Sequence, residues 1–392
     1  MPAINPKSII FPILLVFYEV ATYLANDMYL PALPEMMHDL AWSAQAAQWT
    51  LTTWFIGAAC TPLVMGAISD RFGRRPVLLI GGFIYMLSSV TCALTSTLSI
   101  FLVARFIQGG MMASTLVPGY AVIHELYEKK EAIKMLALMG SISILAPAFG
   151  PFLGSIILLF ADWRWVFWVI AIWIFIFVGL LSYWMPETLP REKRHSLELN
   201  KLFRQYSRVF CNKRFILLVS GVGFMFAGFI VWITAGSLLV MVGFHYTAMG
   251  FGIIQAIIFA SYILGNRRVK YWLDSMGTTL LIQLGLNIVL VGGFILFIFS
   301  VLLPHSLYAF LMGLMIFSFG SALCGAPLNR AIVESNDAPM GARMALFTSF
   351  ITGFGVLGSG FASMFYNGTI HSLAFLIAIA SGMAWILIWV SK

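Results

Sequence analysis

The sequence predicts an all-α membrane protein with twelve transmembrane helices in two six-helix bundles and with both termini cytoplasmic. The first observation is composition: 61% of the 392 residues are hydrophobic and only 10% are charged, which excludes an ordinary soluble domain. The second is length, because apolar stretches of about 20 residues, enough for a helix to cross a bilayer, recur along the chain. The third is the distribution of Lys and Arg between these stretches.

Twelve apolar stretches define the expected spans, and the eighth is the shortest. The first is too long for a cleavable signal peptide, contains two acids and has no small-residue cleavage pattern after it. We therefore interpret it as a span. The expected spans are 9–33, 45–68, 76–95, 98–123, 133–160, 164–185, 214–241, 248–264, 277–303, 306–329, 341–366 and 370–390.

Basic residues between the spans define the orientation. With the N-terminus inside, cytoplasmic segments hold 21 of the 23 Lys and Arg residues, whereas the outer loops hold only Arg164, and Arg105 falls within a span. Cytoplasmic loops of membrane proteins carry such an excess of positive charge. The net charge of +8 is therefore a consequence of topology, and we expect no nucleic-acid partner.

The longest hydrophilic interruption separates six spans from six. We predict an N-terminal bundle at 1–185, a cytoplasmic linker at 186–213 and a C-terminal bundle at 214–392. Two repeated halves around a site at the membrane midplane are typical of secondary transporters. Within the linker, Ser196–Cys211 is predicted to form a basic amphipathic helix, which either lies on the inner membrane surface or is solvated.

No pattern indicates an enzyme or a cofactor. The four cysteines and six histidines are scattered and lack the spacing of a metal site or a disulfide framework. No Gly-rich phosphate-binding loop ends in Lys-Ser/Thr, and no nucleophile–base set is recognisable. We expect a transport protein that uses neither a metal nor a cofactor, with protons as its coupling ion.

Glu19 and Asp27 are the most informative residues, because with Arg105 they are the only charges that lie away from the ends of the predicted spans. A charge at the bilayer centre costs about 3 kcal/mol or more, so such residues persist mainly where they face a wet cavity. At helical rise, Glu19 lies near the midplane and Asp27 about 12 Å further out, close to the expected depth of Arg105. Buried carboxyl groups can exchange protons near neutral pH, so we predict proton coupling by Asp27, Glu19 and Arg105. The alternatives are a structural ion pair of one acid with Arg105, or an arginine that bonds backbone carbonyls.

The loop 66–76 indicates conformational change, because an acid lies among arginines between glycines. We predict a tight turn whose ion pairs form and break, with an acid at the inner end of the fourth span joining them. A purely topological role of the basic loop is the alternative. The predicted switch residues are Gly66, Asp70, Arg71, Gly73, Arg74, Arg75 and Glu125.

The fifth span combines glycines, which permit close helix approach, with prolines, which bend helices. We expect it to form a close, bendable contact with the other half, or to be simply tightly packed. The residues concerned are Gly140, Pro147, Gly150, Pro151 and Gly154.

Together these segments resemble the major facilitator superfamily over essentially the whole chain. Gly66–Arg75 resembles its signature loop after the second span, and Arg105-x-x-Gln-Gly resembles the proton-coupling motif of its fourth span. Ala146–Gly154 is similar to the fifth-span motif of the twelve-spanner drug:proton antiporters, although Ser155 stands where that motif often has a second glycine. Tyr18-Glu19 through Asn26-Asp27-Met28 looks closest to the Mdf-type multidrug transporters of Gram-negative bacteria.

The resemblance implies the major facilitator fold, a multi-pass location in a bacterial inner membrane, and roles for Glu19 and Asp27 in binding substrate and proton. We therefore expect a proton-coupled multidrug efflux antiporter that exports lipophilic compounds, cationic or neutral, as a monomer in the lipid bilayer. An exporter of one endogenous metabolite, such as a siderophore, is the main alternative. A proton-coupled importer and a non-transporting membrane protein fit the motifs less well. The predicted substrate-binding residues are Glu19, Tyr23, Asn26, Asp27 and Met139.

Overall fold

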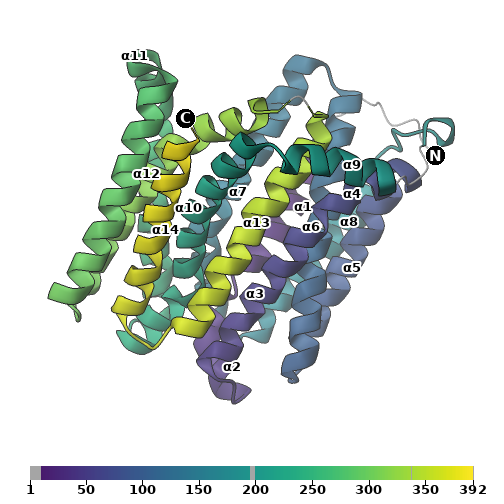
Figure 1. The fold of residues 1–392 in the computed structure, drawn as a ribbon. Helices are drawn as coiled ribbons and strands as arrows, with labels where there is room; N and C mark the ends of the chain where they lie inside the picture. Colours follow the sequence, from purple (N-terminus) through teal and green to yellow (C-terminus); the bar gives the residue numbers. More distant parts are fainter. Residues whose placement is uncertain (1–9, 195–198, 337, 392) are drawn as a thin grey trace.

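The computed structural model describes residues 10–194, 199–336 and 338–391, and within these ranges every regular element is helical. The long helices lie side by side in one bundle (Figure 1). Each predicted span falls on a helix, so the all-α membrane class is confirmed. The long helices are α1 (Ile10–Asp27), α3 (Ala44–Cys60) with α4 (Pro62–Phe72), α5 (Arg74–Leu94), α6 (Leu98–Leu126), α7 (Lys129–Leu158), α8 (Arg164–Trp184), α10 (Lys213–Leu238), α11 (Ala248–Leu302), α12 (Leu307–Glu334), α13 (Met340–Phe365) and α14 (Ile370–Val390).

In the described part of the chain, nine helical segments are long and apolar enough to cross a membrane, and the bent pair α3–α4 makes a tenth. α11 accounts for two predicted spans because it reverses direction. Gly265 and Gly285 both face α12, where a Cβ would touch residues between 319 and 324, although a straight helix would separate them by about 30 Å. The reversal occurs at Gly277, whose φ of 77° glycine adopts readily. The prediction that the eighth span ends at 264 was therefore too short.

The first two predicted spans are not single straight helices, and prolines explain both breaks. α1 ends at Asp27 and is followed by a 3₁₀ turn, η1 (Leu30–Ala32), and by α2 (Leu33–Asp39), each with a proline in its first turn. The second span bends by 51° between α3 and α4, at Pro62. Proline has no backbone N–H to continue a helical hydrogen-bond ladder. As a result, Asp27 lies at the end of a helix rather than inside one.

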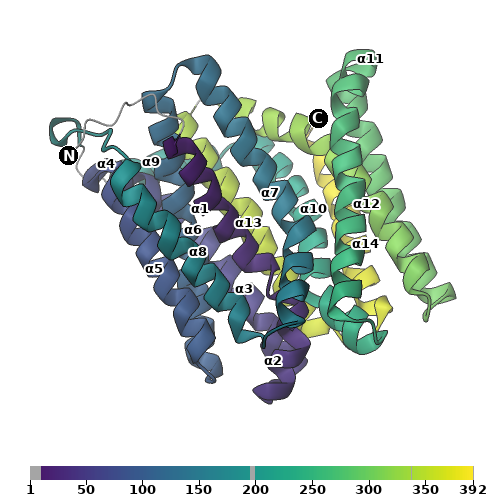
Figure 2. The same cartoon turned by 180° about the vertical axis from the view of Figure 1, so that it is seen from behind.

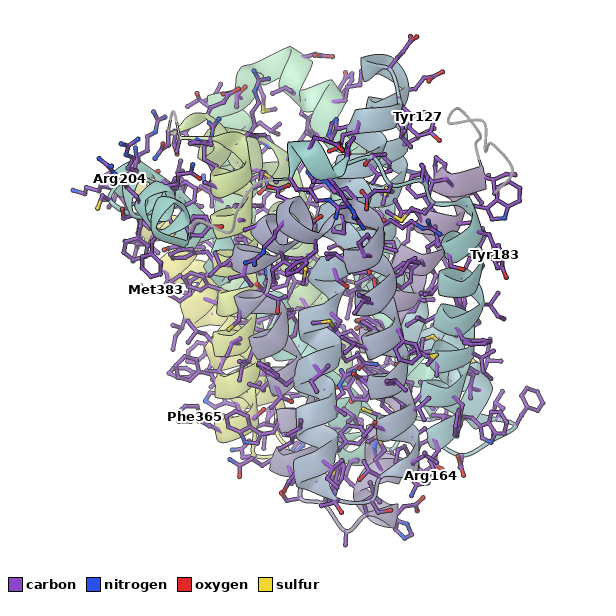
Figure 3. All side chains as sticks on the ribbon, turned by 90° about the vertical axis from the view of Figure 1, so that its right-hand side faces the viewer. Tyr127, Arg164, Tyr183, Arg204, Phe365 and Met383 are labelled. Carbon is purple, nitrogen blue, oxygen red and sulfur yellow. The ribbon has the colours of Figure 1, made fainter. Side chains whose placement is uncertain are left out.

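The first residue of α1 and the last of α14 lie at the same end of the bundle, which we name the terminal end (Figure 1 and Figure 2). Arg204 lies at the terminal end, whereas Arg164 lies at the opposite end (Figure 3). This placement agrees with the expected loop positions. The assignment of the terminal end to the cytoplasm stays a prediction.

Helices of the first six predicted spans touch those of the last six toward the opposite end. The Ser359 hydroxyl of α13 donates a hydrogen bond to Thr52 Oγ1 of α3 at 2.8 Å. Gly252 of α11 packs on α7, where a Cβ at position 252 would lie 2.9 Å from the Phe152 Cα. Figure 2 shows α7 and α11 close together near this contact and far apart at the terminal end. The predicted domain limits at 185 and 214 are not tested by these contacts and stay predictions.

A short linker helix, α9 (Leu199–Phe210), crosses the terminal end beside α4 and α13 (Figure 1). The Tyr206 hydroxyl donates to the Leu63 carbonyl of α4 at 2.6 Å, and the Phe210 ring lies 5.8 Å from that of Phe350 on α13. Burial raises the pKa of Tyr206. α9 thus contacts helices from both sets of spans, and residues 195–198 before it lie outside the described ranges.

Candidate functional site

Glu19 lies in the middle of α1 and is completely buried. Its Oε1 accepts a hydrogen bond from the Tyr120 hydroxyl of α6 at 3.2 Å. Its Oε2 is buried without a hydrogen-bond partner among the described residues. Tyr23, one helical turn further along α1, is half-buried and lies within electrostatic range of Glu19. Glu19 therefore has one oxygen held by a phenol and one oxygen left to bind a proton or a cation.

Asp27 is the last residue of α1 and is only 3% exposed. Its Oδ1 has no hydrogen-bond partner in the described part of the chain. On α7, Gly150 lies against Asp27, so that a Cβ at position 150 would come within 2.5 Å of the Asp27 Cβ. Eight residues separate Asp27 from Glu19, which corresponds to about 12 Å along a helix. The two acids therefore occupy separate positions, as the sequence predicted.

Arg105 is completely buried on α6 and makes its hydrogen bonds with neutral groups. Nη2 donates to Asn26 Oδ1 at 3.3 Å, Nη1 to Gln108 Oε1 at 2.5 Å, and further bonds reach two backbone carbonyls, those of Ala25 and Thr50. The guanidinium also lies over the Tyr29 ring, 4.3 Å from its centroid, in the geometry of a cation–π contact.

The predicted coupling of Asp27 to Arg105 stays a prediction. Arg105 lies within electrostatic range of Asp27 but forms no ion pair with it among the described residues. Instead it contacts Asn26, the neighbouring residue of the chain. The Asn26 side-chain oxygen accepts from Arg105, and its predicted role in binding substrate stays a prediction. Met139 is completely buried.

The loop after α4 forms a network of charges at the terminal end. Arg74 pairs with Asp70 at 2.6 Å and with Glu125 of α6 at 3.3 Å. Gly73 has a φ of 104°, which favours glycine, and a Cβ there would collide with the Glu187 carboxylate. This carboxylate accepts a hydrogen bond from the Arg74 backbone N–H at 3.0 Å. The predicted proximity of Asp70, Arg74 and Glu125 is observed, and their role as a switch stays a prediction.

The other predicted switch residues are peripheral to this network. The Arg75 guanidinium donates to the Ser182 carbonyl at the end of α8. Arg71 lies over its neighbour Phe72, 5.3 Å from the ring centroid. Gly66 has a loose environment, because a Cβ there would reach only Val117, at 4.0 Å.

The fold and the motif positions agree with one protein family. A model described as "Major Facilitator Superfamily" matches residues 15–358. The chain belongs to the major facilitator superfamily.

Relatives and solved structures of this superfamily match along most of the chain. The multidrug transporter MdfA of Edwardsiella ictaluri is 30% identical over 385 residues, 97% of this chain and 92% of that protein. The chloramphenicol resistance protein CraA of Acinetobacter baumannii is 30% identical over 359 residues, 89% of this chain and 85% of that protein. A D-xylose-proton symporter and the nucleoside transporter NupG share the fold, with TM-scores of 0.73 and 0.72, 19% and 16% identity, and coverage of 97% of this chain and 98% of each of theirs. The major facilitator fold is thus confirmed.

In this superfamily member, the glycines of the antiporter-like motif face their own half. Gly150 packs on Asp27, and Gly154 packs on the Met28 carbonyl, both next to the end of α1. The contact with the other half is made by the segment between them, because Gly252 of α11 lies against Pro151 and Phe152. The predicted close contact of the 140–154 stretch with the other half is therefore observed at Pro151 and Phe152, and its bending stays a prediction. Pro147 lies within α7, and the surroundings of Gly140 lie outside the described residues.

Sequence reasoning missed Tyr120, Glu187 and Thr188. Tyr120 is a polar side chain in an apolar helix and is 101 residues from its partner Glu19, so nothing local distinguishes it from a core aromatic. The Thr188 hydroxyl donates to Glu125, beside the Glu187 contact to the loop. Glu187 and Thr188 follow Pro186, just after the sixth predicted span. A glutamate at such a position cannot be distinguished in the sequence from an ordinary loop residue.

The described residues include no group of three or more His, Cys, Asp or Glu side chains that could hold a metal ion. The expectation that this chain uses neither metal nor cofactor stays a prediction.

Proposed function

We propose that this chain exports small lipophilic compounds, cationic or neutral, in exchange for protons. The observation that carries the proposal is the pair of buried carboxyl groups of Glu19 and Asp27, each with one oxygen that lacks a hydrogen-bond partner among the described residues. A buried polar group without a partner is costly, and binding a proton or a cationic substrate removes that cost. A proton-coupled exchanger needs such groups, because at least one buried carboxyl must give up its proton when the substrate is bound.

The two acids have separable roles in this proposal. Asp27 is the main proton carrier, because it lies at the end of α1 between α7 and the segment that Arg105 holds. Glu19 binds the positive group of cationic substrates with its free oxygen, while Tyr120 fixes the other oxygen. Neutral substrates do not need Glu19 and compete with the proton on Asp27 through the conformational change.

The names of two relatives support drug-like cargo: one is a multidrug transporter and the other a chloramphenicol resistance protein. The basic loops support placing the terminal end in the cytoplasm of a bacterial inner membrane. With that orientation, the separation of α7 and α11 at the terminal end (Figure 2) corresponds to an inward-facing arrangement.

Alternating access then requires contacts that differ between the two states. Closing the terminal end breaks contacts such as Ser359 to Thr52 at the other end and brings α13 toward the loop of Asp70 and Arg74. A cargo drives this change only through its different affinity for the two states. We propose that Asp70 and Arg74 stabilise the outward-open state, and that the chain works as a monomer.

The test uses inverted membrane vesicles in which a pH gradient, acid inside, is imposed. Accumulation of a labelled cationic dye that collapses when the gradient is dissipated supports proton-driven export. Accumulation that does not depend on the gradient contradicts it. Drug-sensitivity profiles of cells that express the chain separate multidrug export, which protects against several unrelated compounds, from export of one metabolite, which protects against none.

A further inference from the structure

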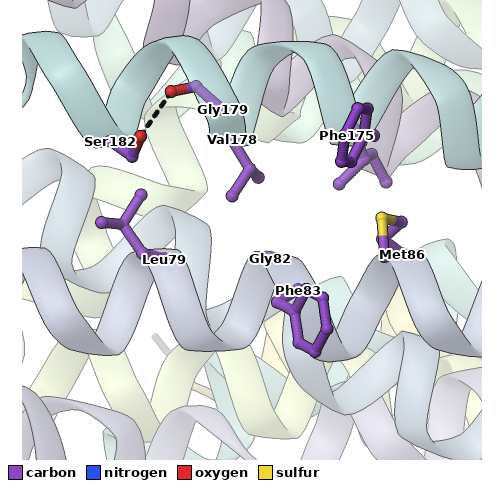
Figure 4. Close-up of a pocket in the computed structure, with 9 residues that line it drawn as sticks. Leu79, Gly82, Phe83, Met86, Phe175, Val178, Gly179 and Ser182 are labelled. Atoms are coloured by element: carbon purple, nitrogen blue, oxygen red, sulfur yellow. Dashed lines mark hydrogen bonds between the residues drawn. The ribbon is translucent and has the colours of Figure 1, made fainter.

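An apolar groove lies between α5 and α8 and opens away from the bundle (Figure 4). Phe83 of α5 and Phe175 of α8 border it and are 53% and 65% exposed. In a protein that spans a membrane, such exposed rings face lipid chains. None of the acids of the candidate transport site lines this groove.

Two glycines give the groove its depth. A Cβ at Gly82 would lie 2.6 Å from Val178 and 2.7 Å from the Tyr18 hydroxyl, so the floor there is closely packed. A Cβ at Gly179 would meet nothing within 4 Å, so this position borders open space. The lining extends from Leu79 to Met86 on α5, about 10 Å of helix, which is about two thirds of the half-thickness of a hydrocarbon core of about 30 Å. The groove thus covers most of the length of one acyl chain in one leaflet.

A positive charge lies at the end of the groove nearest the terminal end. Ser182 lines that end, and its backbone carbonyl accepts a hydrogen bond from Arg75 Nη2. The Ser182 hydroxyl is turned back to the Gly179 carbonyl at 2.6 Å (Figure 4). A guanidinium has five N–H donors, and its planar fork matches the oxygens of a phosphate. Arg75 is half-buried, so part of it is accessible to a ligand.

We propose that this groove binds one anionic phospholipid, with an acyl chain between α5 and α8 and the phosphate against Arg75. The apolar lining favours a hydrocarbon chain, and the guanidinium of Arg75 favours an anion. A phospholipid supplies both in one molecule, with its phosphate just beyond the end of the acyl chain. The groove opens to the leaflet on the side of the terminal end. This inference does not depend on proton coupling or on the identity of the exported compound.

Native mass spectrometry of the full-length, delipidated protein tests the site, with phosphatidylglycerol and phosphatidylcholine of identical acyl chains as probes. We expect one phosphatidylglycerol to bind about fivefold more tightly than phosphatidylcholine, the effect of one basic residue near an anionic lipid. Arg75→Gln should abolish this preference and leave phosphatidylcholine binding unchanged. Equal binding of both lipids to the unmodified protein would overturn the role of Arg75.

A second variant tests the groove itself. Gly179→Leu should place its side chain in the space beside the groove, where a Cβ meets nothing within 4 Å, and lower the binding of both lipids about tenfold. The matched control is Gly382→Leu on α14, where a Cβ also meets nothing within 4 Å, and it should bind lipid like the unmodified protein. If Gly179→Leu has normal thermal stability and still binds phosphatidylglycerol like the unmodified protein, the proposed site is wrong.

Discussion

Gly150 of α7 lies so close to Asp27 of α1 that a Cβ at position 150 would stand 2.5 Å from the Asp27 Cβ. One turn later, Gly154 makes the same close approach to the Met28 carbonyl. The glycine-rich stretch of the fifth span therefore determines where the end of α1 can lie. If Asp27 carries protons, this stretch sets the position of the carrier.

Replacing this glycine should displace Asp27. Gly150→Ala adds a Cβ that α1 must move to accommodate, and overpacking of this kind costs about 1–3 kcal/mol. If this cost falls on the transporting state, we expect gradient-driven transport in inverted vesicles to fall by about 5- to 150-fold, the factor that corresponds to 1–3 kcal/mol. Gly382→Ala, which meets no atom within 4 Å, is the control and should transport normally. Normal transport by Gly150→Ala would show that the position of Asp27 is not limiting.

Glu19 and Asp27 each have one carboxylate oxygen without a partner among the described residues, but at separate positions. Replacing each acid by its amide should therefore change the range of exported compounds in a different way. Glu19→Gln removes the negative charge that attracts cations but leaves Asp27 intact, so export of cationic compounds should be lost while export of neutral compounds persists. Asp27→Asn should abolish gradient-driven export of both classes. Parallel vesicle assays with one cationic and one neutral compound give the comparison. Equal losses of both classes in Glu19→Gln would contradict separate roles.

The hydrogen bond from Ser359 to Thr52 predicts a shift between conformations. Thr52→Val leaves the buried Ser359 hydroxyl without its acceptor, which costs about 1–3 kcal/mol only while the two helices touch. The ratio of the conformation that is open at the opposite end to the conformation that is closed there should therefore rise by about 5- to 150-fold. Spin labels at the exposed positions 38 and 367 measure this by the distance between α2 and the loop after α13.

Removing both partners provides the control for that experiment. In the double variant Thr52→Val and Ser359→Ala no hydroxyl is left unsatisfied, and loss of both partners can be nearly neutral. The distance distribution should return toward that of the unmodified protein. A distribution that is the same in all three proteins would mean that this bond does not hold the halves together.

The turn at Gly73 predicts a local requirement for glycine. Gly73→Ala imposes a side chain on a φ of 104° and directs its Cβ at the Glu187 carboxylate. Strained backbone of this kind costs about 1–3 kcal/mol, and we expect a lower midpoint in thermal unfolding. Gly341→Ala, a helical position with nothing within 4 Å of a Cβ, should leave the midpoint unchanged. The prediction fails if both variants unfold at the same temperature.

Much of the fold and part of the site could be predicted because the signals are local. A carboxylate such as Glu19 in an apolar stretch is visible in the sequence, and so is the succession of spans. The proximity of Asp70 and Arg74 was also predicted, because a tight turn between two helices keeps residues on either side of it close together. Helix breaks were missed because a hydropathy pattern averages over single prolines such as Pro62.

The remaining contacts depend on which way each side chain points around its helix. Helical rise gave Arg105 and Asp27 similar depths but could not show that Arg105 turns to Asn26. Tyr120 and Glu187 contact residues that are 101 and 113 positions away, and single-sequence periodicity contains no information on such pairs. The site could be predicted as a set of acids, but not with the groups that orient them.

The most direct test of proton exchange at Asp27 measures protons released when substrate is added to purified protein in weakly buffered solution. We expect release by the unmodified protein on binding of a neutral substrate, similar release by Glu19→Gln, and none by Asp27→Asn when binding itself is confirmed. Undiminished proton release by Asp27→Asn would contradict the assignment of Asp27 as the carrier.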